Sequence, residues 1–166
     1  MPRVGIALGS NLGDRVANIQ TAGNWLREIA VPGEPVLCAP VYQTEPMLCP
    51  PGSPYFYNSV IEICYHGTPL ELLKMAKAFE RKLGRSPTSE RNSPRTIDID
   101  LLYFGEQTIE SGELILPHPR IGERRFVLQP LADIRPDLIL PGRLESIAEI
   151  LESLESTEPP LVSAHV

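Results

Sequence analysis

The sequence predicts an α+β domain in which helices pack on one face of a mostly antiparallel sheet. Two observations predict it: β-prone runs alternate with segments whose apolar residues recur every three or four positions, and these elements follow the order strand, helix, strand, strand, helix, strand. A composition of 42% hydrophobic and 22% charged residues is typical of a soluble globular protein. We expect residues 1–155 to form a single domain and residues 156–166 to be a loose tail.

The first half of the chain supplies a strand, a helix and a strand pair. Residues 3–9 are β-prone and lead through the turn-forming SNLGD into a helix that begins at Asp14. The apolar face of this helix is formed by Ile19, Ala22, Leu26 and Ile29. Residues 35–43 and 56–65 are the next expected strands, and a proline-rich loop separates them.

The second helix has a clear start and end. Thr68 is a predicted N-cap, Pro69 occupies the first helical position, and the helix extends to Gly84. Its apolar stripe is formed by Leu72, Ala76, Phe79 and Leu83. The polar, basic loop RSPTSERNSPR follows, and the strand 96–104 comes after it.

The last third of the chain contains shorter elements. We expect a turn at Gly105 to Gln107, a short strand in ELILPHPR, a helix over 123–133 and a last helix over 144–154. The complete order is that of a ferredoxin-like sandwich, which serves many functions, so the fold alone decides none.

Charge and cysteine content narrow the classes of function. The net charge of −6 disfavours general nucleic-acid binding, yet residues 81–95 contain several basic side chains, as in a binder of a small polyanion. The short apolar run Val4 to Leu8 is neither a signal peptide nor a membrane span, so we expect a cytoplasmic protein. Cys38, Cys49 and Cys64 have no CxxC spacing, which argues against a disulfide framework or a zinc site.

Two aspartates interrupt the strand that follows the basic loop. Alternation puts Asp98 and Asp100 on one face and the neighbouring isoleucines on the other, with the two aspartate Cα atoms roughly 6.5 to 7 Å apart. Such a carboxylate pair suits magnesium, which takes its remaining ligands from water and a substrate phosphate. The alternative is a solvent-facing pair neutralised by arginines. Basic residues on both sides favour phosphoryl transfer, namely Arg91, Arg95, His118, Arg124 and Arg125.

At this point the motifs resemble a known family. RNSPRTIDIDLL, together with GSNLGD, YQTEP, YN, LPHPR and RRFVLQPL, is similar to the motifs of the 6-hydroxymethyl-7,8-dihydropterin pyrophosphokinases over about residues 4–142. The resemblance implies a ferredoxin-like fold and transfer of pyrophosphate from ATP to the pterin alcohol in folate biosynthesis, with pterin diphosphate and AMP as products.

The resemblance also implies roles for individual residues. Asp98 and Asp100 would bind two magnesium ions that bridge the ATP phosphates, and Arg85 and Arg95 would close over the reaction centre. The residues expected at ATP are Lys77, Glu80, Arg91, Leu101, Leu114, His118 and Arg124. Those expected at the pterin are Thr44, Met47, Phe56, Asn58, Asn92 and Phe126. Asn92 replaces a tryptophan that many members have, and Phe56 replaces a frequent tyrosine.

Two other functions stay open. One is a ferredoxin-like regulatory module that binds a nucleotide without turning it over. The other is a magnesium nuclease, which the net charge of −6 disfavours. The expected partners are ATP and a pterin alcohol, without nucleic acid, membrane or obligate protein partner.

Overall fold

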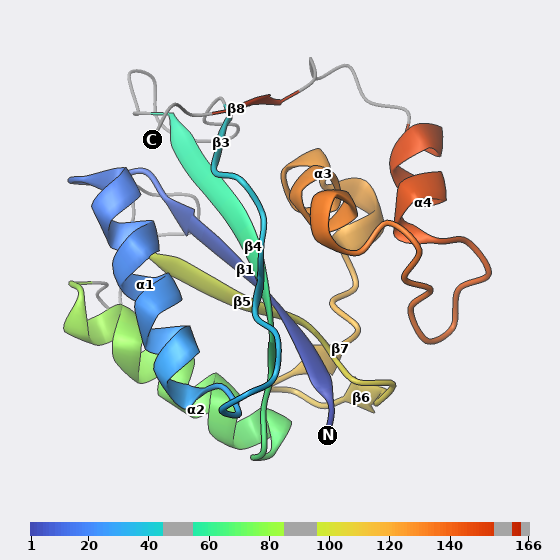
Figure 1. The fold of residues 1–166 in the computed structure, drawn as a ribbon, viewed down its shortest axis with the longest axis horizontal. Coiled ribbons are helices and arrows are strands. Elements are labelled where there is room, and N and C mark those ends of the chain that lie inside the picture. The colour runs from blue at the N-terminus through green and yellow to red at the C-terminus, as the bar shows by residue number, and fades with distance from the viewer. Residues whose placement is uncertain (45–54, 85–95, 155–160, 164–166) are drawn as a thin grey trace.

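An antiparallel sheet forms the centre of the molecule (Figure 1). The computed structural model describes residues 1–44, 55–84, 96–154 and 161–163. From one edge to the other the main strands are β5 (Asp98–Phe104), β1 (Arg3–Ser10), β4 (Phe56–Cys64), β3 (Tyr42–Thr44) and β8 (Val162–Ser163). The short β2 (Leu37–Cys38) also pairs with β4, and β6 (Ile109–Glu110) pairs with β7 (Ile115–Leu116) in a separate hairpin.

Most of the predicted strands are confirmed, with three differences. The expected strand over 35–43 is divided into β2 and β3, because Pro40 has no amide hydrogen to donate to a ladder. The hairpin strand β6 was not predicted. In the tail that we expected to be loose, β8 pairs with β3 at the far edge of the sheet.

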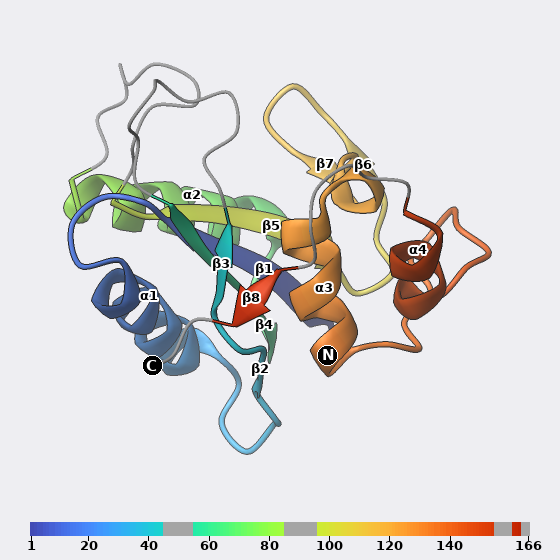
Figure 2. The same cartoon turned by 90° about the horizontal axis from the view of Figure 1, so that it is seen from above.

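Helices cover both faces of the sheet, so the expectation of helices on one face is wrong (Figures 1 and 2). One face packs against α1 (Arg15–Ile29) and α2 (Pro69–Lys82), and the other against α3 (Arg125–Ile134) and α4 (Ile147–Ser153). The reason is that the central strands are apolar on both sides: in β4, Ile61 lies in the first core and Val60 in the second.

Each face has its own hydrophobic core. Buried members of the first core, under α1 and α2, include Val4, Ile6, Leu8, Leu26, Leu72 and Ile97. Buried members of the second core, under α3 and α4, include Leu102, Ile121, Leu128, Leu131, Ile147 and Ile150.

Side-chain caps fix where three helices begin. Asp14 accepts a hydrogen bond from the amide of Ala17 at 3.1 Å at the start of α1. Thr68 and Glu71 form a capping box at the start of α2. The last helix begins later than residue 144, because Ser146 and not an earlier residue supplies the N-cap of α4.

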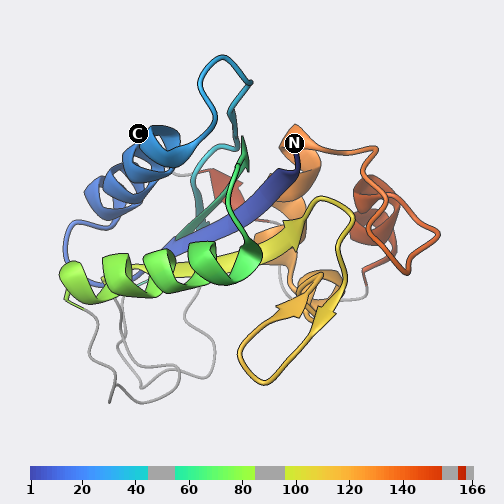
Figure 3. The same cartoon turned by 90° about the horizontal axis from the view of Figure 1, so that it is seen from below.

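The edge strand β5 lies beside α2, which Figure 3 shows running along it. Its pairing with β1 shifts register between Gly5 and Ile6, so that Leu102 and Tyr103 both face the second core. Before this irregularity, from Ile97 to Leu101, successive side chains alternate between the two faces of the sheet. The segment from β7 to α3 contains a short 3-10 helix, η1 (Ile121–Glu123).

No helix in the described ranges is long and apolar enough to cross a membrane.

Candidate functional site

Asp98 and Asp100 lie on the face of β5 that is turned toward α3. Both side chains are half-buried, whereas Ile97 and Ile99 are 0% and 5% exposed in the first core. The alternation predicted from the sequence is therefore confirmed, and two carboxylates project from one face of an edge strand.

His118 lies beside the carboxylates because its backbone continues the edge of the sheet. Its amide donates to the carbonyl oxygen of Leu102 at 2.7 Å. Burial, followed by the positive charges of Arg124 and Arg120, lowers the pKa of His118, while Asp98 raises it. The net direction is downward, so the imidazole is neutral at pH 7.

The tautomer of His118 follows from its hydrogen bond. Nδ1 accepts from the backbone amide of Arg120 at 3.2 Å. A neutral imidazole that accepts at Nδ1 carries its proton on Nε2, so Nε2 is left as a donor for an anionic ligand.

Arg124 comes from the residue immediately before α3. Burial lowers its pKa, and the carboxylates of Asp100 and Asp98 act in the opposite direction. A guanidinium stays charged at neutral pH in spite of such a shift. The site therefore combines two carboxylates with a cation and a neutral imidazole, which is a set that suits a phosphate with a metal ion.

The residues expected at the pterin lie on the same side of the sheet. Gly9 of β1 stands between Asp98 and Asn58, since it pairs with both. Asn58 is 7% exposed, and its amide group donates to the hydroxyl of Thr44 at 2.8 Å. Phe56 is half-buried and pairs with Thr44 across β3 and β4.

Phe126 joins this side of the molecule from α3. It is half-buried against the second core, and the guanidinium carbon of Arg124 lies 5.5 Å from the centre of its ring. An aromatic ring, an amide and a hydroxyl thus occupy the same face as the carboxylates.

The residues expected around the adenine lie at the outer edge of β5 and on α2. Leu101 is 3% exposed in the first core, and Leu114 packs against that core. Glu80 is buried on α2, where Oε2 accepts from the amide of Ile99 at 2.7 Å. Lys77 is an exposed residue of the same helix. The carboxylates and these residues are therefore on different sides of β5.

Five other expected residues lie outside the described part of the chain. They are Met47, Arg85, Arg91, Asn92 and Arg95.

The acidic pair fits a magnesium ion by the chemistry of its donors. Within the described ranges, no group of three or more His, Cys, Asp or Glu side chains could hold a metal. Magnesium does not need such a group, because it commonly binds through one or two carboxylates, waters and substrate phosphates. Asp98 and Asp100 provide two carboxylates of this kind.

Sequence reasoning assigned no role to Ser10, although it lies in the GSNLGD motif. Its hydroxyl is buried and donates to the carbonyl oxygen of Thr96 at 2.5 Å, two residues before Asp98. The alternation of the strand could have indicated that Ser10 is buried, because Ile6 and Leu8, on the same face, are core residues. A buried hydroxyl needs a hydrogen-bond partner.

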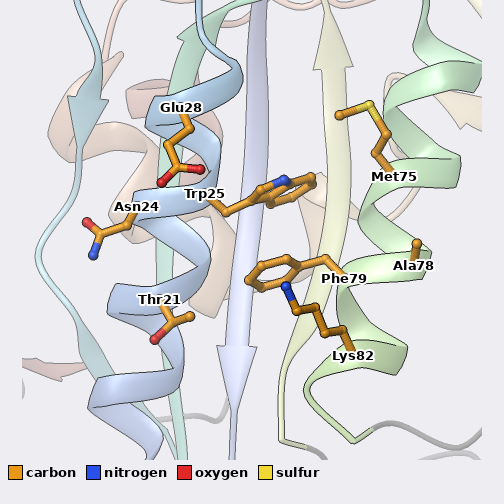
Figure 4. A pocket seen from close by; sticks show the side chains of 8 residues that line it. All are labelled: Thr21, Asn24, Trp25, Glu28, Met75, Ala78, Phe79 and Lys82. Atoms are coloured by element: carbon orange, nitrogen blue, oxygen red, sulfur yellow. The ribbon is translucent and has the colours of Figure 1, made fainter.

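The structure also has a groove on the far side of the sheet, between α1 and α2 (Figure 4). The rings of Trp25 and Phe79 lie in it, stacked with centroids 4.7 Å apart. Asp98 and Asp100 do not line this groove, and the sheet separates it from them.

Comparison with known proteins identifies the family of this chain. A sequence model described as 7,8-dihydro-6-hydroxymethylpterin-pyrophosphokinase (HPPK) matches residues 5–136. The chain is 36% identical over 155 residues to the 2-amino-4-hydroxy-6-hydroxymethyldihydropteridine pyrophosphokinase of Methylorubrum extorquens, with 93% of this chain and 95% of that protein covered. It is 40% identical over 129 residues to the protein of the same name from Bacillus subtilis, with 78% and 75% covered.

Other relatives are much longer. The folic acid synthesis protein fol1 of Pneumocystis carinii is 39% identical over 150 residues, which are 90% of this chain but 20% of that protein. The chain thus spans about a fifth of the length of that relative. The crystal structure of Plasmodium falciparum HPPK-DHPS with pteroate has a TM-score of 0.70 at 16% identity, covering 91% of this chain and 42% of that one.

At that identity the structural likeness concerns the fold, and it agrees with the predicted ferredoxin-like arrangement. The sequence matches cover most of the chain. The chain belongs to the 7,8-dihydro-6-hydroxymethylpterin-pyrophosphokinase family.

Proposed function

We propose that this chain transfers a pyrophosphoryl group from ATP to the hydroxymethyl group of 6-hydroxymethyl-7,8-dihydropterin. The products are the pterin diphosphate and AMP. Family membership supports the reaction, and one feature of the structure carries it: Asp98 and Asp100 project from one face of β5, where Asp98 interacts electrostatically with His118 and Arg124, and Asp100 interacts with Arg124.

Asp98 and Asp100 are the proposed magnesium ligands, and two ions are expected. Bound there, magnesium supplies positive charge that offsets the charge of the phosphates during transfer. The two side chains leave a common face of β5, so they approach a ligand from one direction.

Arg124 and His118 are proposed to bind and orient the phosphates. Arg124 offers a charged fork of donors, and its half-buried position reduces competition from water. His118 offers its Nε2 proton as a neutral donor, and the hydrogen bond from Arg120 to Nδ1 fixes the ring. The bond between the His118 amide and Leu102 keeps this donor beside β5.

Asn58 and Thr44 are proposed to read the hydrogen-bonding edge of the pterin. Their mutual bond at 2.8 Å orients the Asn58 amide and leaves its oxygen toward Gly9, where an added Cβ would lie 3.0 Å from it. Phe56 and Phe126 are proposed to contact the flat faces of the pterin.

The nucleotide base is proposed to lie on the other side of β5. Leu101 and Leu114 would border the adenine there, with Lys77 and Glu80 on the neighbouring helix. The family resemblance assigns further contacts to Arg85, Arg91, Arg95, Met47 and Asn92. The proposed compartment is the cytoplasm, since ATP is available there.

The proposed reaction is an in-line displacement. The pterin hydroxymethyl oxygen loses its proton to water and forms a bond to the β-phosphorus. The bond from that phosphorus to the oxygen shared with the α-phosphorus breaks, and AMP leaves with the bonding electron pair. Arg124 and His118 would hold the transferred group while the carboxylates hold the ions beside it. This arrangement positions charge where it develops, which is the main requirement of phosphoryl transfer.

The test is an assay with ATP, magnesium and the pterin alcohol in which nucleotide products are separated by chromatography. AMP should form in equal amount to the pterin diphosphate. Formation of ADP would contradict attack at the β-phosphorus. Binding of an ATP analogue without pterin-dependent AMP release would favour a regulatory module instead.

A further inference from the structure

The buried stripe of α2 contains a carboxylate. Glu80 is 6% exposed and follows Leu72 and Ala76 at spacings of four residues, and those two side chains are 0% and 1% exposed. An apolar residue at this position would continue the stripe. A buried carboxylate is unfavourable unless it accepts hydrogen bonds, so a glutamate here requires a partner that repays its desolvation.

One partner of the Glu80 carboxylate is the backbone of β5. Oε2 of Glu80 accepts from the amide of Ile99 at 2.7 Å, within the buried part of the molecule. β5 is the edge strand of the sheet, and alternate residues of an edge strand turn their amides toward and away from the neighbouring strand. The Ile99 amide therefore faces the open edge, where Glu80 takes the place of a further strand.

Ile99 is the residue between the two carboxylates. Its side chain is 5% exposed in the first core, while Asp98 and Asp100 project to the opposite face. Rotation or shift of the Ile99 backbone would move both aspartates at once, because one peptide unit joins it to each of them. The Glu80 bond restrains this movement.

A second restraint acts just before the pair. Ser10 donates to the carbonyl oxygen of Thr96 at 2.5 Å. The start of β5 is thus held from β1 by Ser10 and from α2 by Glu80, with Asp98 between these two points.

We propose that Glu80 is a positioning residue that fixes the spacing and direction of Asp98 and Asp100 through the Ile99 amide. This inference rests on the proposed function, in which the two aspartates hold divalent cations. It differs from a contact between Glu80 and the nucleotide, because it requires a hydrogen-bond acceptor at this position and not a negative charge. Loss of residues that orient metal ligands typically costs about 10 to 100-fold in metal affinity.

Two substitutions separate the acceptor from the charge. Glu80→Gln keeps an oxygen that accepts from Ile99 and removes the charge, whereas Glu80→Leu removes both and keeps the packing volume. Leu72→Ala is the matched control, since it weakens the buried face of the same helix away from Ile99.

The first measurement is the affinity for Mn²⁺ in the presence of α,β-methylene-ATP, with bound and free Mn²⁺ distinguished by electron paramagnetic resonance. Glu80→Gln should stay within about twofold of wild type, and Glu80→Leu should bind Mn²⁺ about 10 to 100-fold more weakly. Leu72→Ala should lower Tm without changing the Mn²⁺ affinity of the folded protein.

The second measurement needs neither ligand nor turnover. Hydrogen exchange of the Ile99 amide, followed by NMR in the ligand-free protein, should stay slow in Glu80→Gln and become faster in Glu80→Leu. In Leu72→Ala, any faster exchange should match the loss of global stability.

The inference is overturned if Glu80→Gln loses as much Mn²⁺ affinity as Glu80→Leu, because the charge would then be what matters. It is also overturned if Glu80→Leu binds Mn²⁺ as wild type does. Wild-type protein that binds Mn²⁺ and the analogue but releases no AMP from ATP and the pterin would contradict the proposed function alone.

Discussion

Two rows of residues cross the same face of the sheet and use their charges differently. In one row Gly5 of β1 stands between Tyr103 of β5 and Glu62 of β4. In the other row Gly9 stands between Asp98 and Asn58. The rows are four residues apart along β1, which corresponds to roughly 13 Å.

The Gly5 row is closed by the protein itself. Glu62 is 0% exposed, and it accepts from Nε of Arg3 at 2.8 Å, from Nη1 of Arg135 at 2.5 Å and from the hydroxyl of Tyr103. A buried carboxylate with three donors is well compensated. Through these bonds Glu62 links its own strand β4 to β1, to β5 and to the end of α3.

The Gly9 row is open to solvent by comparison. Asp98 is half-buried, and Asp100 two residues along is half-buried as well. Arg124 and His118 lie near these two aspartates. Their hydrogen-bond donors can bind the phosphate of a ligand as well as a carboxylate of the protein. In this protein the enclosed charges of the Gly5 row therefore stabilise the fold, whereas the partly exposed charges of the Gly9 row are available to a ligand.

The largest expected effect is on activity, from substitution of the two aspartates at the Gly9 row. Asp98→Asn and Asp100→Asn should each lower AMP formation by about a thousandfold, equivalent to about 4 kcal/mol in the barrier, because each removes a charged metal ligand. The free energy of unfolding should change by less than about 1 kcal/mol, since both side chains are half-exposed.

The control for these variants is Asp137→Asn, an exposed aspartate beyond α3. It should keep wild-type AMP formation. Retention of most of the activity by either site variant would contradict the role of the pair.

In the Gly5 row, Gly5→Ala should have the largest effect on the free energy of unfolding. An added Cβ would lie 2.1 Å from the ring of Tyr103, so that ring must move away from Glu62. We expect the free energy of unfolding to fall by about 3 kcal/mol, measured by urea denaturation. A change below about 1 kcal/mol would show that the row is not tightly packed.

Tyr103→Phe removes a single donor to Glu62 and should cost about 2 kcal/mol at neutral pH. Burial, together with the charge of Glu62, raises the pKa of Tyr103 above its ordinary value of 10.0. The folded protein therefore keeps this proton when the unfolded chain loses it. Stability from Tyr103 is complete below about pH 10 and declines as the pH rises further.

Urea denaturation at increasing pH checks this sign. The stability difference between wild type and Tyr103→Phe should narrow above about pH 10, by up to about 1.4 kcal/mol per pH unit. Tyr42 and Tyr65 are present in both proteins, and their raised pKa values should affect both curves equally. A difference that stays constant to about pH 11 would contradict burial of the neutral phenol.

Gly9→Ala should have the smallest effect, and it should be on binding. The added Cβ would lie 3.0 Å from Oδ1 of Asn58 and 4.0 Å from Cβ of Asp98, so Asn58 has to shift by a few tenths of an ångström. We expect KM for the pterin to rise about threefold to tenfold while stability changes by less than about 1 kcal/mol. An unchanged KM with a lower kcat would place the effect on the acidic pair instead.

Much of the fold is encoded locally. The N-cap at Thr68 and the alternation from Ile97 to Asp100 were predicted and are confirmed, and the predicted helix start at Asp14 lies one residue before the observed start of α1 at Arg15. The covering of both sheet faces was missed, because a continuous apolar run such as that in β4 does not show which elements pack on each side. The late start of α4 was missed because Leu144 is 96% exposed despite its apolar side chain.

For the site, the charged residues were identified from the sequence, whereas the hydrogen bonds that hold them in place were not. Strand alternation identified the acidic pair, the distribution of basic residues pointed to His118 and Arg124, and the family resemblance assigned their roles. The structure brings these four residues to one side of β5. The bonds made by Ser10 and Glu80 could not be predicted, because each joins a side chain to the backbone of a distant segment. Such contacts depend on tertiary packing and leave no periodic signal in the sequence.

In the proposed function, Asp98 and Asp100 hold divalent cations against the phosphates of ATP. Anomalous diffraction from a crystal containing Mn²⁺, α,β-methylene-ATP and the pterin would locate these cations. We expect anomalous peaks within about 2.2 Å of carboxylate oxygens of both aspartates and of phosphate oxygens. Carboxylates bonded only to water or to guanidinium groups, with the Mn²⁺ peaks elsewhere on the nucleotide, would contradict metal binding by Asp98 and Asp100.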